Sequence, residues 1–376
     1  MTENNLQTHW TDKPMSQDLA PIKDALLVPW GTNEPKGAKR AAGLFDAAGS
    51  YLPQAECLRF DAAPVTIAPE FDADTPTETL DGRYLFGGML YGHFGHFLCE
   101  STGRLWALAQ DLGCDGVVWF PKVALGHPAK LVKPYHPFFN AMGLAHLDLR
   151  APQKNTRIAE VIIPEQGFGI GTLSSGRPEY RAFMQANLGA AIAADGPEKL
   201  YISRSGLPTK RGSVLLEPEI ERRLAAEGYQ IFHPQDHSIE VQIARYKAAR
   251  FIVALDGSAL HLAAMLISPA CKVAIINRGP SQNIDDYLRQ FEAFAGVMPT
   301  RIDAVSAYWF PQGRRVVKRE THALLDLPAL GAGLSAAGFR GASAWPPANP
   351  AEVAAEIASR EARSETPLTR YEAEPA

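Results

Sequence analysis

Charged and small residues stand directly after four apolar runs in the second half of the sequence. They are Arg204 after LYIS, His233 after YQIF, the triplet Asp256-Gly257-Ser258 after RFIVAL, and Arg278 after KVAIIN. An arginine can grip two oxygens of one phosphate. Gly257 allows a tight turn into a helix, and the first amides of that helix, from Ser258 onward, favour an anion. With Lys210 as a further cation, these residues predict a site for a phosphate-bearing ligand.

The fingerprints of two large nucleotide-binding classes are missing from the sequence. Neither the phosphate-loop pattern GxxxxGK followed by Ser or Thr nor the dinucleotide pattern GxGxxG occurs. This absence argues against a nucleoside triphosphatase and against a nicotinamide-dependent dehydrogenase. A nucleoside diphosphate held by arginines and amides remains as the ligand class.

A second group of polar residues occupies one short segment: His93, His96, Glu100 and Arg104. The last three are four residues apart, so on a helix they share one face. In one interpretation, Glu100 or His96 is the general base that takes a proton from an acceptor hydroxyl. In a second, His93, His96 and Glu100 bind the metal of a hydrolase. In a third, Glu100 only pairs with Arg104, and His96 hydrogen-bonds the start of the helix.

We expect no metal and no other cofactor. The spacing HxxHxxxE is not a compact metal signature. Asp72 and Asp74 offer the paired carboxylates that hold a divalent cation in some transferases, but their proline-rich stretch is typical of a solvated turn. The cysteines contain no CxxC pair, which argues against a zinc ribbon or a dithiol redox site; they are Cys57, Cys99, Cys114 and Cys271.

The elements that must position these residues are clearest in the second half. Strand-like and helix-like patterns alternate between Lys199 and Arg278, which predicts a doubly wound parallel sheet with every strand's carboxyl end at one edge. Ligands of such sheets bind outside that edge. The first half is less regular, but apolar strands at 84–90, 117–120 and 158–163, a helix over 92–113 and another over 178–194 are compatible with a further α/β domain.

Length and composition set the remaining bounds. The 376 residues suggest two main domains, which we expect at 1–195 and 196–340, followed by a C-terminal helix and a disordered tail within 341–376. A net charge of -4 with mixed signs gives no drive to bind nucleic acid. No apolar run approaches the roughly 18 residues of a membrane span, and the polar start lacks the layout of a secretory signal. A cytoplasmic location follows as the expectation, while peripheral membrane docking stays open.

Three stretches of the sequence resemble conserved blocks of glycosyltransferase family 61. They are GHFGHFLCESTGRLWAL, KLYISRSGLPTKRGSVLLEPEI and EVQIARYKAARFIVALDGSALHLAAML. Their order and spacing agree with the family over residues 84–280. The matching positions include His96, Glu100, Arg104, Gln242, Ala249 and Gly257.

The resemblance implies a GT-B fold, with two Rossmann-like domains facing across a cleft and the donor nucleotide in the second. It also implies an inverting hexosyl- or pentosyltransferase that moves a sugar from a nucleotide-sugar, such as UDP-xylose or UDP-N-acetylglucosamine, to a glycan acceptor. Bacterial members are associated with capsular or surface polysaccharide synthesis. The sequence departs from the family at Phe97, Asp256 and Ser258, where the family usually has Trp, His and Ala.

The combined expectation assigns roles to particular residues. Arg204, Lys210, Gly257, Ser258 and Arg278 would hold the diphosphate, and Glu100, His96 or Asp256 would take the acceptor's proton. Two alternatives stay open at this point. One is a non-catalytic module that binds a nucleotide or an anionic glycan, and the other is the metal-dependent hydrolase built on His93, His96 and Glu100.

Overall fold

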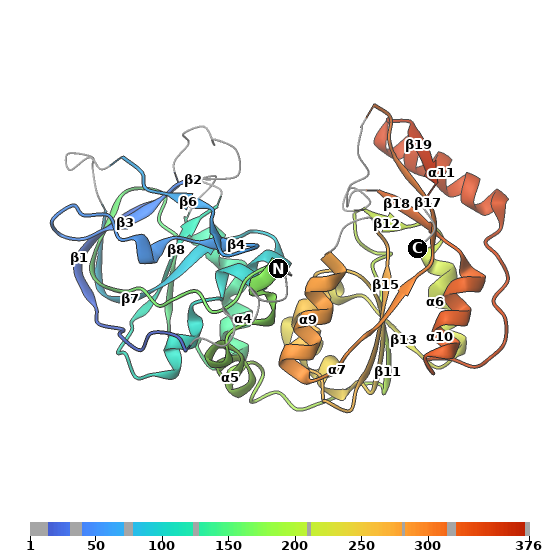
Figure 1. The fold of residues 1–376 in the computed structure, drawn as a ribbon, viewed down its shortest axis with the longest axis horizontal. Coiled ribbons are helices and arrows are strands. Elements are labelled where there is room, and N and C mark those ends of the chain that lie inside the picture. The colour runs from blue at the N-terminus through green and yellow to red at the C-terminus, as the bar shows by residue number, and fades with distance from the viewer. Residues whose placement is uncertain are drawn as a thin grey trace, which may run out of the picture. The chain divides into compact units, whose positions relative to one another are not determined.

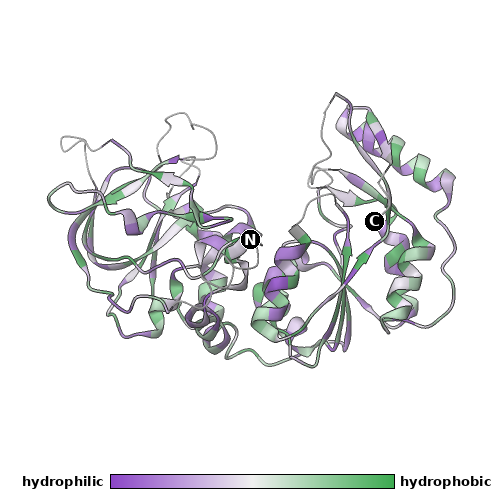
Figure 2. Ribbon diagram, viewed as in Figure 1, coloured by the Kyte–Doolittle hydropathy of each residue, from purple (hydrophilic) through white to green (hydrophobic). Residues whose placement is uncertain are grey.

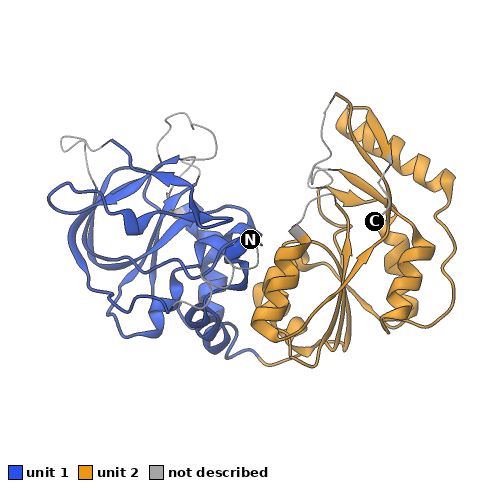
Figure 3. Cartoon of the chain, viewed as in Figure 1, with its two compact units in different colours: residues 1–192 blue, residues 193–376 orange. Residues whose placement is uncertain are grey.

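The protein is described by a computed structural model that covers residues 14–30, 40–70, 78–122, 128–208, 212–279, 283–313 and 321–372. The chain divides into two compact units, Met1–Ile192 and Ala193–Ala376, which Figure 3 colours separately. Among the described residues, no helix is long and apolar enough to cross a membrane. Each unit is an α/β structure with its own sheet.

A six-stranded mixed sheet forms the centre of unit 1 (Figure 1). Its strands, in spatial order, are β3 (Gly43–Phe45), β1 (Ile22–Val28), β10 (Thr156–Ile162), β7 (Glu78–Leu90), β8 (Gly116–Pro121) and β9 (Asp148–Arg150). The last four run parallel, whereas β1 is antiparallel to both of its neighbours. The strands expected at 84–90, 117–120 and 158–163 are confirmed as parts of β7, β8 and β10. A purely parallel Rossmann-like sheet is not formed here, because β1 and β3 enter as antiparallel neighbours without a helical crossover.

Short elements surround this sheet. Two small pairings join β2 (Arg40–Ala41) to β6 (Thr66–Ile67) and β4 (Leu58–Arg59) to β5 (Ala63–Pro64). The helical pieces are η1 (Pro53–Ala55), α3 (Pro128–Val132), η4 (Lys133–Tyr135), α4 (His136–Ala141), η5 (Gly171–Ser175) and α5 (Pro178–Asn187). The helix expected over 178–194 therefore ends seven residues early, at Asn187.

The continuous helix expected over 92–113 is wrong. The segment consists of one turn, α2 (Phe94–His96), a π-helical turn, η2 (Phe97–Ser101), and a separate 3-10 helix, η3 (Leu105–Ala109). Side chains compete here with the helix for the backbone, since the Thr102 hydroxyl donates to the Leu98 carbonyl and the Ser101 hydroxyl to the Met89 carbonyl. Such π-turns are frequent at functional sites.

Unit 2 contains the doubly wound parallel sheet that its sequence predicts. The order is β13 (Gln230–Phe232), β11 (Lys199–Ile202), β14 (Phe251–Leu255), β15 (Lys272–Asn277) and β16 (Thr300–Asp303), with every pair parallel. Helices α7 (Ile239–Ala248) and α9 (Asn283–Ala295) flank one face, and α6 (Glu217–Ala226) and α10 (Leu327–Ala336) the other (Figure 1). The short helix α8 (Ala259–Ala264) follows β14. In chain order the strands are arranged 2-1-3-4-5, so the order reverses between β11 and β14.

Figure 2 shows how the helices of unit 2 meet this sheet, with apolar and polar residues alternating along α9. Ile284, Tyr287 and Phe291 recur at helical spacing and are buried. The opposite face of α9 stays polar. The helix is therefore fixed to the sheet by burial of one apolar stripe.

The C-terminal segment packs onto unit 2 instead of remaining disordered. Helix α11 (Pro350–Ser364) is followed by strand β19 (Leu368–Glu372). Strand β19 completes a small sheet in the order β12 (Ser213–Val214), β18 (His322–Leu325), β17 (Val305–Pro311) and β19. Strand β19 is antiparallel to β17. The expected disordered tail is thus wrong for 368–372, because this stretch satisfies its backbone on the edge of β17; residues 373–376 lie outside the described part.

Candidate active site

Two parallel strands of unit 1, β7 and β8, end beside each other and are followed by Tyr91 and Lys122. Leu90 pairs with Pro121, and the Lys122 amide donates to the Leu90 carbonyl at 3.0 Å. Ligands of parallel sheets bind outside the carboxyl ends of the strands. This edge is therefore the first candidate site, and the π-helical turn that follows β7 contributes its side chains.

His96 and Glu100 meet at this turn, and Arg59 at the end of β4 completes the group. His96 Nδ1 lies 2.6 Å from Glu100 Oε2. Arg59 donates from Nε to Oε1 at 2.5 Å and from Nη2 to Oε2 at 2.9 Å. The Glu100 side chain is only 4% exposed, whereas that of His96 is 34% exposed. The arrangement is a buried carboxylate that holds a partly exposed imidazole.

The surroundings of Glu100 keep it ionised. Burial alone would raise its pKa, but the hydrogen bonds from His96 and Arg59 outweigh burial and lower the pKa below the ordinary value. An ionised carboxylate only accepts hydrogen bonds, so the proton of the shared contact sits on His96 Nδ1. The other ring nitrogen, Nε2, is then the atom able to accept a proton. Glu100, with both oxygens engaged, orients His96 better than it serves as a base itself.

His93 does not complete a metal site with this pair. Its ring packs edge-on against that of His96, with centroids 5.4 Å apart. Within the described ranges, no group of three or more His, Cys, Asp or Glu residues is placed to hold a metal ion. His93, His96 and Glu100 therefore do not form the ligand set that a metal-dependent hydrolase requires. Asp72 and Asp74 lie outside the described residues.

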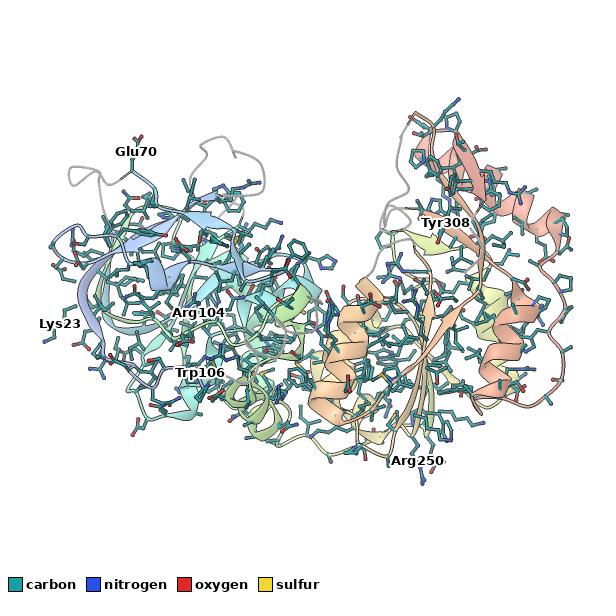
Figure 4. All side chains as sticks on the ribbon, in the orientation of Figure 1. Lys23, Glu70, Arg104, Trp106, Arg250 and Tyr308 are labelled. Carbon is teal, nitrogen blue, oxygen red and sulfur yellow. The ribbon has the colours of Figure 1, made fainter. Side chains whose placement is uncertain are left out.

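Arg104 leaves the helical stripe on which its spacing would place it. The side chain is buried inside unit 1 (Figure 4). Its guanidinium donates to the backbone carbonyls of Gln54 and Glu56, at 3.1 and 2.7 Å, and to that of Pro164. The expected pairing of Glu100 with Arg104 is wrong, since the broken helix turns Arg104 inward. Arg104 ties together three segments of unit 1 that surround the site.

The second candidate site lies in unit 2, where Arg204 follows β11 and Gly257 follows β14. These are the two strands between which the order of the sheet reverses. A Cβ atom on Gly257 would lie 2.6 Å from Arg204 Nη1, so only glycine leaves room for the guanidinium there. The sequence-based prediction that both residues share one edge is supported by this contact.

Arg204 is a half-buried cation without a carboxylate ion pair among the described residues. Its Nε is enclosed and has no hydrogen-bond partner within that part of the chain, and Nη2 reaches only the Gly212 carbonyl, at 3.5 Å. Burial lowers the pKa of Arg204 to about 10 and repulsion from Arg278 adds to the shift, against the opposing attraction of Asp256. Enclosing a charge without a partner is costly. The site is therefore complementary to an anion.

Asp256 and Arg278 neutralise each other beside Arg204. Arg278 Nε lies 2.8 Å from Asp256 Oδ1 and 2.9 Å from the Asp256 carbonyl. Both side chains are buried, at 3% and 5% exposure for Asp256 and Arg278. The pair makes Asp256 a partner that positions Arg278. Because Asp256 is engaged in this way, it does not form an ion pair with Arg204.

Residues 94–291 match the family model described as Glycosyltransferase 61, more than half of the chain. The chain belongs to glycosyltransferase family 61. It is therefore a glycosyltransferase at the level of the family, with a donor and an acceptor as its substrates. The matched range begins in α2 and ends in α9, so it includes both His96 with Glu100 and Arg204 with Gly257. No curated protein matches the sequence.

In this family 61 member, the start of α8 offers fewer free amides to a phosphate than its sequence predicts. Helix α8 has six residues, and its Leu260 amide is already bonded to the Gly257 carbonyl at 3.0 Å. The expected row of free amides from Ser258 to Leu260 is thus wrong at Leu260, because the chain enters α8 through a tight turn. Ser258 stands at the start of α8, and its side chain does not cap the helix. Lys210 lies outside the described residues.

Residues that sequence reasoning missed hold both sites in place. In unit 2, Glu217 accepts the Arg204 amide at 2.7 Å and hydroxyl hydrogen bonds from Tyr201 and Ser203, both at 3.2 Å. Burial raises the pKa of Glu217 to about 7, although the hydrogen bond from the Arg204 amide opposes the shift. A glutamate in the first turn of a helix is common, so its sequence position gave no signal.

Arg59 of unit 1 was missed for a different reason. It precedes Glu100 by 41 residues and lies in a two-residue strand without any periodic pattern. Tyr91 and Lys122 had a usable signal, since each directly follows an apolar strand. Residues that follow the carboxyl ends of parallel strands are candidates for ligand binding, and this rule, which identifies Arg204 in unit 2, also identifies Tyr91 and Lys122 in unit 1.

Proposed function

We propose that this family 61 enzyme transfers a sugar from a nucleoside-diphosphate sugar, of the UDP type, to a hydroxyl group of a glycan acceptor, with inversion at the anomeric carbon. The donor diphosphate would bind at the edge of unit 2, against Arg204. The acceptor would bind at the edge of unit 1, next to His96. The GT-B arrangement that the resemblance implies would bring both substrates together, and surface polysaccharide synthesis would be its setting.

The observation that carries the donor assignment is the unmatched charge of Arg204. The guanidinium lies at the point of the sheet where nucleotide ligands of doubly wound folds bind, and no described carboxylate neutralises it. A diphosphate would supply the missing negative charge through two parallel hydrogen bonds. The Asp256–Arg278 pair would fix the neighbouring backbone without repelling the phosphates, since its own charges cancel.

The chemical step follows from the two sites. The acceptor oxygen attacks the anomeric carbon while the bond from that carbon to the β-phosphate oxygen breaks. His96 Nε2 takes the hydroxyl proton, and Glu100 stabilises the resulting imidazolium through Nδ1. Arg204 stabilises the charge that develops on the departing diphosphate, and such electrostatic stabilisation usually contributes more to the rate enhancement than any other effect. Of the three candidate bases, this proposal assigns the role to His96.

Release of UDP from nucleotide sugars tests the proposal. Purified protein is screened by thermal shift against UDP-xylose, UDP-N-acetylglucosamine and other UDP-sugars, and UDP release is then followed for those that bind. We expect slow donor hydrolysis that His96→Gln reduces, and that a chelator leaves unchanged. Binding without any hydrolysis or transfer would instead favour a non-catalytic nucleotide-binding module. Binding of no nucleotide sugar would contradict the proposal.

A further inference from the structure

Among the described residues, cations outnumber carboxylates at the edge of unit 1 beside His96. Arg59 Cζ lies 4.9 Å from the centroid of the Tyr91 ring, and Lys122 Nζ lies 5.0 Å from the same centroid. Tyr91 in turn stacks on His96, with ring centroids 5.3 Å apart. Two cations are therefore held around one aromatic ring that touches the candidate base.

A third cation acts on the same place. Partial burial lowers the pKa of Lys122, and the positive charges of Arg59 and Arg40 lower it further, against the attraction of Glu100. Arg40 is fixed over the Trp30 ring, with Cζ 4.2 Å from the centroid. Within the described part of the chain, the charges that act on Lys122 most strongly are those of two arginines and one carboxylate.

The carboxylate of Glu100 already binds other residues. Glu100 makes two hydrogen bonds with Arg59 and one with His96, so its charge already offsets that of Arg59, and it attracts Lys122 without forming an ion pair with it. Lys122 is exposed and has no salt bridge with a described residue, and the lowered pKa shows that its surroundings disfavour its charge. A ligand that brought a negative charge to this point would relieve the repulsion.

We propose that the acceptor of this enzyme is an anionic saccharide whose carboxylate or phosphate group binds Lys122 next to the hydroxyl that reacts at His96. That this saccharide is the acceptor rests on the proposed function, but its binding to Lys122 does not depend on catalysis. Tyr91 itself is buried, so it does not contact the saccharide; its ring holds Arg59 and Lys122 next to His96. A neutral acceptor would leave the excess charge at this edge unmatched.

Three one-ring saccharides, two anionic and one neutral, test the proposal. Binding of methyl β-glucuronide, glucose 6-phosphate and methyl β-glucoside is measured by NMR titration on the intact protein with UDP at saturation. Saturating UDP occupies the phosphate site of unit 2, so that binding there does not obscure the result. We expect the two anions to bind at least about 10-fold more tightly than the neutral glucoside, in line with the strength of a charge-assisted hydrogen bond.

Lys122→Met should remove this preference and Lys122→Arg should retain it. The matched control is Lys23→Met, which deletes the same charge from an exposed position on β1. Lys23 projects outward from the periphery of unit 1 (Figure 4). An anion preference that survives Lys122→Met, or equal binding of all three saccharides, would overturn the proposal. Because UDP binding is recorded in the same samples, absence of the anion preference with intact UDP binding would leave the proposed function standing. Preference for only one anion would identify the acidic group as carboxylate or phosphate.

Discussion

Arg204 and Gly257 are in contact across the reversal point of the unit 2 sheet, and the space for the guanidinium exists because residue 257 has no side chain. The Cβ atom of an alanine at this position would stand 2.6 Å from Nη1. That distance is too short for two non-bonded heavy atoms, so the arginine would have to move. The backbone at Gly257 does not have a positive φ angle, so alanine is not strained there by conformation.

Gly257→Ala should therefore weaken nucleotide binding without unfolding the protein. The flexible end of Arg204 can swing away at little cost to stability, but it then no longer points into the site. We expect UDP affinity to fall by about 10-fold or more, the loss of one charge-assisted contact, while the melting temperature changes little. Calorimetric titration with UDP and a thermal melt measure the two quantities.

Gly341→Ala is the matched control for this variant. It lies in the same unit, also without a positive φ angle, and its added Cβ would meet the Glu227 carboxylate at an ordinary 3.7 Å. We expect unchanged UDP affinity. If both variants bind UDP like the wild type, Arg204 does not depend on the space at Gly257.

Glu100→Gln should lower the rate of sugar transfer far more than it lowers donor binding. An amide can donate to His96 and so favours the wrong tautomer, and it removes the charge that stabilises the protonated imidazole. A loss of about 100-fold to 10,000-fold in kcat is the range expected for an impaired general base. Transfer rates under single-turnover conditions and calorimetric UDP affinities separate the two effects. Equal losses of rate and of UDP affinity would place Glu100 outside the chemical step.

The pKa of Glu217 predicts that unit 2 loses stability as the pH rises. The folded state holds the carboxyl proton up to about pH 7, whereas the ordinary pKa of a glutamate side chain is 4.5. Between these values the folded state binds more protons than the unfolded state, so the free energy of unfolding falls as pH increases. Glu217→Gln, which mimics the protonated form, should gain up to about 3 kcal/mol relative to the wild type between about pH 5 and about pH 8. Urea unfolding at both values measures the difference.

His322, a second titrating group in unit 2, is the control for this dependence of the free energy of unfolding on pH. Burial and the positive charge of Arg360 lower the pKa of His322 to about 4, so its contribution changes with pH in the opposite direction. His322→Gln should reduce the loss of stability on acidification from about pH 6.5 to about pH 4, and Glu217→Gln should not. If the two variants change the pH dependence in the same direction, the assignment of these charges is wrong.

Deleting residues 365–376 should destabilise unit 2, since β19 closes the small sheet. Five residue pairs join β19 to β17, and the Leu368 amide donates to Glu361 at 2.7 Å. We expect a loss of about 2 to 3 kcal/mol, which lowers the melting temperature by roughly 4 to 12 °C. The milder Leu368→Ala should give a smaller drop, because it removes apolar contact but keeps the strand pairing. A deletion that melts like the wild type would show that β19 adds no stability.

An element of this fold could be predicted where the residues that form it are close together in the sequence. The parallel sheet of unit 2 was predictable because each strand is a short apolar run and a helix connects each strand to the next. Its strand order then places Arg204 and Gly257 at one edge. In unit 1, β1 pairs with β10 across more than a hundred residues, with Ile22 opposite Val161, and no local pattern encodes such a pairing.

The candidate site of unit 1 shows the same limit at the scale of side chains. The spacing of His96 and Glu100 predicted that they lie on one face, and they meet there because one helical turn, regular or π, brings them together. The same spacing failed for Arg104, since side-chain hydrogen bonds from Ser101 and Thr102 end the helix before it. The partner that does bind Glu100 is Arg59, whose position follows only from the tertiary fold.

The measurement that tests the account most directly is calorimetric titration of UDP into the wild type, Arg204→Lys and Arg204→Ala. Arginine grips two phosphate oxygens and lysine supplies only a point charge, so Arg204→Lys should keep part of the affinity. Arg204→Ala should bind UDP about 10-fold to 150-fold more weakly, with the fold intact by circular dichroism. Binding of UDP by folded Arg204→Ala as tight as that of the wild type would place the phosphate site elsewhere and contradict the donor assignment.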